Sequence, residues 1–198
     1  MTLHALILAG GRGSRLGDVR KARLRVGGIP LLDRVVRRLH DLPVLLATGP
    51  GSTPGFNIGV EIPDDSSSYA GPMAGISAAL RHLGPDTGPD DLLLTLAVDT
   101  PFLPEDYATR MIAALTSGAD AAFAIWGGEL YPTNAIYRLC PALQKIHETR
   151  PHSPKALLRS LEAVEVDWTD DAGENPFANL NTLTDLLALG RRAIATGK

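Results

Sequence analysis

The segment with the most potential for chemistry is LILAGGRGSRLGDVRK, residues 6–21, where four glycines and four cations follow a short aliphatic run. Glycine lets backbone N–H groups approach a bound anion closely, and successive N–H groups in a loop form a concave anion site. Arginine grips phosphate oxygens in pairs, whereas lysine supplies a compact point charge. The segment therefore predicts a polyphosphate site, although composition alone fits a solvated basic loop equally well.

This positive charge is local, because the whole chain of 198 residues has a formal net charge of −3. Between Arg12 and Arg25 there are six cations and a single anion, Asp18. Such a density of like charge repels itself unless solvent or a bound anion compensates it. The pI near 5.9 argues against general nucleic-acid binding, which depends on a net basic surface. No nucleic acid is expected as a partner.

Two familiar phosphate motifs do not match the segment. A P-loop requires Lys-Ser/Thr directly after its second glycine, and that pair is missing here. The dinucleotide pattern G-x-G-x-x-G is only approached by Gly11, Gly13 and Gly17, with one residue too many before the third glycine. The second predicted strand ends in Ala47-Thr48 rather than in the acid that binds ribose. The pattern argues against a nicotinamide dehydrogenase.

Apolar runs of strand length alternate along the chain with amphipathic stretches of helix length. The predicted strands are 5–9, 43–48, 59–62, 92–98, 121–126, 134–137 and 163–166. The predicted helices are 31–40, 72–83, 104–117, 141–148, 154–161 and 184–195. Strands 5–9 and 92–98 do not alternate polar and apolar residues, which indicates that both of their faces are covered. The pattern predicts an α/β fold, a mostly parallel sheet with helices on each side, in one domain spanning 1–198.

The order of these elements indicates where a ligand binds. In an open α/β sheet, ligands occupy the crevice beyond the carboxyl ends of the strands. The loops after the first and fourth predicted strands, the second of which begins with Asp99, should therefore hold the chemistry. Asp99 also precedes Pro101 and could simply be a turn residue. Thr182 followed by Asp185 has the spacing of a capping box, which predicts the start of the last helix.

The remaining sequence features concern the compartment. The longest apolar runs, such as LLLTLAV at 92–98, are far shorter than the roughly 20 residues that cross a bilayer. The N-terminal residues lack the basic start and small-residue cleavage site of a secretion signal. The lone Cys140 cannot form an intramolecular disulfide and fits a reducing compartment. These features predict a cytoplasmic location and no membrane partner.

Five segments of the chain resemble a known family. Residues 8–21, LAGGRGSRLGDVRK, are similar to the nucleotidyltransferase signature L-A-G-G-x-x-x-R-M-G-x-x-x-K, with Leu16 in place of Met. IPDDSSSYAGPMAG, AVDTPFLP, PTNAIY and FANLNTLTDL follow in the family's order. Together they resemble the molybdenum cofactor guanylyltransferases, which transfer GMP from GTP to the terminal phosphate of molybdopterin. The resemblance implies a three-layer α/β/α fold of the nucleotide-diphospho-sugar transferase type, with a Rossmann-like, mostly parallel sheet.

The resemblance also implies roles for individual residues. Arg15, Lys21 and Asp99 would be catalytic, with the two cations neutralising the triphosphate. Asp99 and Asn181 would hold Mg²⁺, the implied cofactor, which takes few protein oxygens together with phosphates. Residues 132–134 would face the pterin. The implied nucleotide-binding set is Leu8, Ala9, Gly10, Gly11, Gly13, Lys21, Asp64, Gly71, Pro72, Gly75 and Asp99.

Three positions depart from the family pattern. Arg20 stands where an Asp commonly precedes the lysine, and Tyr131 stands where the pterin-side segment usually begins with His. The second strand ends in Ala47-Thr48-Gly49, where the family often has an Asn that contacts the nucleotide. The identities of the base and of the acceptor therefore stay open at this point.

The leading hypothesis is a magnesium-dependent guanylyltransferase that uses GTP and molybdopterin and has delivery partners among molybdoenzymes or their chaperones. No side chain needs to act as a nucleophile, because the acceptor phosphate is already ionised and catalysis requires mainly charge compensation and alignment. One alternative keeps this chemistry but uses CTP, or a sugar or alcohol phosphate as acceptor. A non-catalytic carrier of a nucleotide or cofactor is the other alternative.

Overall fold

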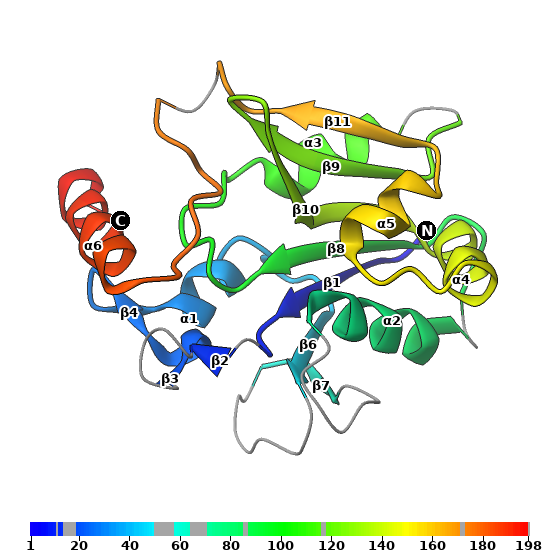
Figure 1. The fold of residues 1–198 in the computed structure, drawn as a ribbon, viewed down its shortest axis with the longest axis horizontal. Coiled ribbons are helices and arrows are strands. Elements are labelled where there is room, and N and C mark those ends of the chain that lie inside the picture. The colour runs from blue at the N-terminus through cyan, green and yellow to red at the C-terminus, as the bar shows by residue number, and fades with distance from the viewer. Residues whose placement is uncertain are drawn as a thin grey trace.

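The computed structural model describes residues 1–10, 12–13, 19–49, 58–63, 71–84, 87–115, 118–170 and 173–197. Its central sheet (Figure 1) consists of β1 (Leu3–Leu8), β6 (Val44–Gly49), β7 (Val60–Pro63), β8 (Leu92–Ala97), β9 (Ala121–Trp126), β10 (Glu129–Arg138) and β11 (Ala163–Asp167). The helices are α1 (Leu31–Val36), α2 (Pro72–Leu83), α3 (Tyr107–Ala114), α4 (Leu139–Glu148), α5 (Pro154–Arg159) and α6 (Leu183–Thr196). The shorter elements are β2 (Arg12–Gly13), β3 (Val19–Arg20), a 3-10 turn η2 (Lys21–Arg23), β4 (Arg25–Val26) and β5 (Ile29–Pro30).

The central sheet is mostly parallel, as predicted. Its strand order is β11-β9-β10-β8-β1-β6-β7, and among these described strands only β10 runs antiparallel to its neighbours. In the register, Leu8 lies beside Ala47 of β6 and beside Ala97 of β8. The carboxyl ends of β1, β6 and β8 therefore meet at one edge of the sheet.

Helices cover both faces of this sheet, which confirms the predicted three-layer arrangement. On one face, α1, α3 and α6 pack over a buried apolar cluster that takes Ala5 and Ile7 from β1. On the other face, α2, α4 and α5 pack over a second cluster, to which the same strand contributes Leu6. Successive side chains of a strand point to opposite faces, so the aliphatic run of β1 fills both layers. None of the helices described by the structure is both long and apolar enough to span a membrane.

Strand β10 is longer than its predicted extent of 134–137, because it begins directly after a hairpin turn that the prediction lacks. Gly127 and Gly128 join β9 to β10 and have φ angles of 58° and 76°. A two-residue hairpin turn needs two residues in the left-handed region, and adjacent glycines adopt it without steric cost. The Gly-Gly pair between two apolar runs was the signal for this hairpin.

The helix predicted over 154–161 ends at Arg159, and two other helices fall further short of their predicted lengths. The helix predicted over 31–40 ends at Val36, and residues 37–41 continue as turns. In these turns the N–H groups of Arg38 and Leu39 donate to carbonyls three residues earlier rather than four. The helix predicted over 104–117 begins at Tyr107, whose N–H donates to the carbonyl of Pro104 in a preceding turn. In both cases the amphipathic pattern extends into turn residues that pack on the same core, so periodicity alone could not find the boundary.

Packing requires glycine at position 10. A Cβ on Gly10 would lie 2.7 Å from the backbone N and 3.0 Å from the Cα of Gly49. Gly49 closes β6 with a φ of 81°, a conformation that disfavours a Cβ. Two glycines therefore let the ends of β1 and β6 lie against each other, which is a structural requirement in addition to any contact with a ligand.

Gly10→Ala is expected to destabilise the protein by roughly 1–3 kcal/mol, the usual cost of forcing an extra methyl group into a filled space. The obstructing atoms are backbone atoms, which cannot rotate away as a side chain can. Urea denaturation followed by circular dichroism measures the effect. Gly173→Ala is the control, because a Cβ there meets no atom within 4 Å, and its free energy of unfolding should stay within about 0.5 kcal/mol of wild type.

Candidate functional site

The site lies at the point where the strand order reverses: β6 and β7 follow on one side of β1, and β8 lies on its other side. In open α/β sheets a ligand crevice lies at such a switch point, beyond the carboxyl ends of the strands. In Figure 1 the arrowheads of β1 and β8 point toward the side of the molecule that holds β3, β4 and α6. The loops that leave β1 and β8 thus meet the start of α6.

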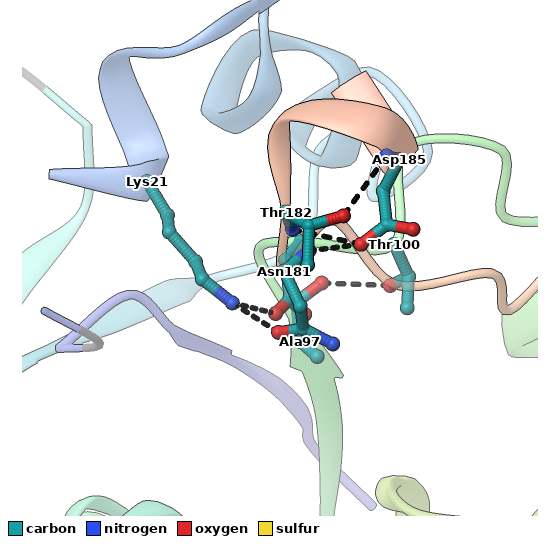
Figure 2. A network of polar contacts seen from close by, with 7 residues as sticks. Lys21, Ala97, Thr100, Asn181, Thr182 and Asp185 are labelled. Atoms are coloured by element: carbon teal, nitrogen blue, oxygen red, sulfur yellow. Dashed lines mark hydrogen bonds and ion pairs between the residues drawn. The ribbon is translucent and has the colours of Figure 1, made fainter. Parts of the chain in front are cut away.

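Three side chains meet at this edge although they are far apart in the sequence. The Lys21 ammonium donates to Oδ2 of Asp99, 78 residues away, at 2.7 Å. It also donates to Oδ1 of Asn181, 160 residues away, at 2.6 Å. Figure 2 shows the extended Lys21 side chain with dashed lines to two oxygens, one of them on the labelled Asn181. The predicted neighbourhood of Lys21, Asp99 and Asn181 is therefore present in the structure.

The position of Asp99 is fixed by hydrogen bonds on both sides of it. The N–H of Val98 donates to the carbonyl of Leu8 at 3.3 Å, which continues the pairing of β8 with β1. The Thr100 hydroxyl donates to the carbonyl of Ala97 at 2.7 Å and closes the turn (Figure 2). Every residue of β8 is buried, Val98 is buried too, and Asp99 is the first residue beyond the strand that is partly accessible.

The position of Asn181 is fixed by its neighbours in the chain. The N–H of Leu180 donates to the carbonyl of Asp99 at 3.0 Å, so the two segments are joined through their backbones. The N–H groups of Asn181 and Thr182 donate to Oδ2 of Asp185 at 3.0 and 2.8 Å. The Thr182 hydroxyl accepts from the N–H of Asp185, which confirms the predicted capping box of α6. The backbone bond from Asn181 is the main cause that lowers the pKa of the Asp185 carboxyl.

Lys21 lies in the turn η2, directly after β3. Its carbonyl accepts from the N–H of Leu24 at 3.0 Å, which fixes the backbone at the base of the side chain. The side chains of Lys21 and Asp99 are 13% and 18% exposed. This partial burial weakens solvent screening relative to a surface ion pair, so the charges at the site act strongly on each other and on any ligand.

The oxygens of Asp99 and Asn181 suit a divalent cation. Both lie within 2.7 Å of one positively charged atom, the Lys21 nitrogen, so their lone pairs already converge on a cation. A carboxylate oxygen and an amide oxygen are ligands that Mg²⁺ accepts, and phosphates and water commonly complete its shell. The donor set therefore fits the implied magnesium site.

The other predicted site residues lie at the end of β1, at the start of α2, in β2 or outside the described part of the chain. Leu8, Ala9 and Gly10 form the end of β1 and the backbone beyond it, beside the site. A second group lies at α2, which begins at the same edge because it follows the parallel strand β7: Gly71 is the N-cap with a φ of 76°, Pro72 is the first helical residue and Gly75 is buried. Gly13 belongs to the short strand β2. Three predicted residues lie outside the described part of the chain: Gly11, Arg15 and Asp64.

That residues 132–134 face the pterin stays a prediction, but the Asn134 side chain is not accessible at the surface. Asn134 is fully buried, and its Oδ1 accepts from the N–H of Ala97 at 3.1 Å. This bond joins the side chain to the last residue of β8, while on its other side β10 shifts register against β9 between Tyr131 and Ala135. Tyr131 is buried too, and its hydroxyl donates to Glu129 at 2.8 Å. Burial raises the pKa of the Tyr131 hydroxyl.

Sequence comparison identifies relatives along almost the whole chain. Residues 5–166 match the family model described as the MobA-like NTP transferase domain. The molybdenum cofactor guanylyltransferase of Rhizobium meliloti (strain 1021) is 35% identical over 193 residues, covering 92% of this chain and 88% of that protein. The molybdenum cofactor guanylyltransferase of Rhodobacter capsulatus is 35% identical over 190 residues, covering 94% of each.

Solved structures with the same fold include a protein of molybdopterin-guanine dinucleotide biosynthesis and a cytidylyltransferase. Molybdopterin-guanine dinucleotide biosynthesis protein A from Archaeoglobus fulgidus has a TM-score of 0.73 and 20% identity, covering 98% of this chain and 100% of that one. The 2-C-methyl-D-erythritol 4-phosphate cytidylyltransferase from Thermus thermophilus has a TM-score of 0.70 and 22% identity, with the same coverage. These structures share the nucleotide-diphospho-sugar transferase fold, whereas both sequence relatives named above are molybdenum cofactor guanylyltransferases. The chain therefore belongs to the MobA-like NTP transferase family, together with the molybdenum cofactor guanylyltransferases.

Proposed function

We propose that this chain transfers GMP from GTP to the terminal phosphate of molybdopterin. In this reaction an oxygen of the acceptor phosphate attacks the α-phosphorus of GTP. The bond between the α-phosphorus and the oxygen that bridges to the β-phosphate breaks, and pyrophosphate leaves. The product is the guanine dinucleotide form of the cofactor.

One observation carries this proposal above the others: Lys21, Asp99 and Asn181 meet at the carboxyl edge of β1 and β8. A cation, a carboxylate and an amide at a switch point of a parallel sheet suit a nucleoside triphosphate and its metal ion. The relatives that share 35% identity with the chain are named guanylyltransferases, which supports GTP as the nucleotide and molybdopterin as the acceptor.

Lys21 is proposed to stabilise the negative charge of the triphosphate. Attack on the α-phosphate brings anionic groups together, and charge builds up on the departing pyrophosphate, so a fixed ammonium group lowers the barrier. The backbone at Ala9 and Gly10, beside the end of β6, would line the path of the nucleotide. Arg15 belongs to the same proposal as a second phosphate-binding cation.

Asp99 and Asn181 are proposed to hold Mg²⁺ through one oxygen each. When bound there, a magnesium ion would supply positive charge that offsets the negative charge of the phosphates. Asp99 keeps its position through the turn closed by Thr100, and Asn181 through the capping box of α6. Hydrogen bonds within the protein thus fix both residues that are proposed to coordinate the metal ion.

Nucleotide selectivity is tested by thermal denaturation in the presence of Mg²⁺ and each of the four nucleoside triphosphates. GTP is expected to raise the melting temperature most. At 100 times its dissociation constant a ligand stabilises the folded state by about 2.7 kcal/mol, which for a chain of this size is roughly 5–10 °C. A larger shift with CTP than with GTP would contradict the proposed base.

Catalysis is tested by pyrophosphate release with GTP and molybdopterin, compared with GTP alone and with a sugar phosphate as acceptor. Release that requires molybdopterin is the expected result. Release with the sugar phosphate but not with molybdopterin would contradict the proposed acceptor. Binding of GTP without release of pyrophosphate, with either acceptor, would favour a carrier over an enzyme.

A further inference from the structure

The ring of Phe102 lies beneath two arginines that come from different helices. The guanidinium carbon of Arg34, on α1, is 5.5 Å from the ring centroid. The guanidinium carbon of Arg192, on α6, is 4.3 Å from the same centroid. A guanidinium group within about 6 Å of an aromatic face is attracted by the negative charge of that face. Phe102 itself is buried and lies three residues after Asp99.

Arg34 connects the ring to the segment that carries Lys21. Arg34 is almost completely buried, and its Nε donates to the carbonyl of Val26 at 2.9 Å. The chain from Lys21 to α1 is compact, because the N–H of Leu31 donates to the carbonyl of Leu24 at 2.8 Å. The position of Arg34 over the ring therefore sets the position of this segment relative to the loop of Asp99.

Arg192 connects the ring to the segment that carries Asn181. Its Nη1 donates to the carbonyl of Asn175 at 2.6 Å, and its Nε pairs with the Glu174 carboxylate at 2.8 Å. These bonds fix the chain that leads from residue 174 to the start of α6. Arg192 itself lies in α6, so its contact with Phe102 holds this helix against the loop of Asp99.

From this arrangement we infer that Phe102 is a positioning residue: its ring, which both Arg34 and Arg192 contact, fixes the placement of Lys21, Asp99 and Asn181 relative to one another. The inference deepens the proposed function and depends on it for its effect on catalysis. Three segments converge on the ring: α1, which is bonded to the chain that follows Lys21; α6, which begins just after Asn181; and the loop that carries Asp99 and Phe102 itself. Leucine could fill the apolar volume of the ring, but it has no aromatic face and could not attract the two guanidinium groups.

The first arm of the experiment compares Phe102→Leu with Phe102→Tyr, which keeps an aromatic face. The structural readout is hydrogen exchange of the Leu180 amide, measured by NMR, because this N–H joins the Asn181 segment to the carbonyl of Asp99. Phe102→Leu is expected to speed this exchange about tenfold, and Phe102→Tyr should restore the wild-type rate. The kcat for GMP transfer should fall about tenfold in Phe102→Leu, with KM for GTP within about twofold of wild type.

Matched controls separate positioning from loss of stability. Met111→Ala removes a buried side chain from the same core on α3, which packs against β9, β10 and β11, and it should leave the Leu180 exchange rate and kcat near wild type. Arg192→Met should reproduce the effect of Phe102→Leu, whereas Arg191→Met, an exposed neighbour on α6, should not.

Two results would overturn the inference. The first is an unchanged Leu180 exchange rate in Phe102→Leu, or one that Phe102→Tyr does not restore. The second is a faster exchange rate with an unchanged kcat. If wild type transfers no GMP to any acceptor, the proposed function fails, while the exchange rates still decide whether Phe102 holds the three segments together.

Discussion

Asp99→Asn is expected to reduce the rate of GMP transfer about a thousandfold. Asparagine keeps the shape of the side chain but removes the negative charge that faces Lys21 at 2.7 Å and that would hold the divalent cation. A thousandfold loss corresponds to about 4 kcal/mol of transition-state stabilisation. Losses of this size are typical when one group is removed from a fixed electrostatic site. The measurement is kcat from pyrophosphate release at saturating GTP, molybdopterin and Mg²⁺.

The stability of Asp99→Asn should change far less than its activity. The amide oxygen of asparagine can still accept the hydrogen bond from Lys21, so the expected loss of stability is about 1 kcal/mol, the net value of a single hydrogen bond. For a chain of this size that corresponds to roughly 2–4 °C in melting temperature. Asp106→Asn, at the N-cap of α3, where no side-chain cap bond is made, is the matched control and should keep wild-type activity. A kcat for Asp99→Asn above a tenth of wild type would show that the carboxylate is not essential.

The position of Asp99 could be predicted from the sequence because it follows from topology. The two aliphatic runs around β1 and β8 lack polar alternation, which indicates parallel strands covered on both faces. Parallel strands end at one edge, so the residues that follow them must lie near one another. The contact of Lys21 with Asp99 is the structural outcome of this rule. In contrast, the place of Asn181 rested on family resemblance, since no periodicity connects α6 to the end of β8.

Other parts of the site depend on contacts that sequence patterns do not encode. The clash that keeps a side chain off Gly10 comes from the backbone of Gly49, and only the parallel pairing of β1 with β6 places these residues side by side. The convergence of two arginines on Phe102 is likewise a product of helix packing. Asn134 belongs to the segment predicted to face the pterin, and only the assembled sheet shows that its side chain is buried and bonds the backbone of β8. Local pattern predicts elements, whereas these positions require the assembled fold.

Lys21→Met is expected to reduce kcat/KM for GTP by a hundredfold to a thousandfold, or about 3–4 kcal/mol. Methionine retains most of the apolar stem but removes the ammonium, so the loss would report the charge rather than packing. The Lys21 ammonium lies between Asp99 and Asn181, where it compensates the carboxylate. From this position it could also reach the phosphates of a bound nucleotide. Removing it should therefore weaken both triphosphate binding and charge stabilisation during transfer.

Lys155→Met on α5 is the control for Lys21→Met, because it removes an exposed ammonium group from a helix on the sheet face that α2 and α4 share. It should leave kcat/KM unchanged, which excludes a general effect of net charge on the capture of an anionic nucleotide. kcat/KM is measured for both variants at two ionic strengths. Added salt weakens a long-range attraction of the nucleotide, whereas it weakens a partly buried contact with Lys21 much less. If Lys21→Met transferred GMP as fast as wild type, the ammonium between Asp99 and Asn181 would be a structural ion pair, and charge compensation would have to come from other cations of the segment.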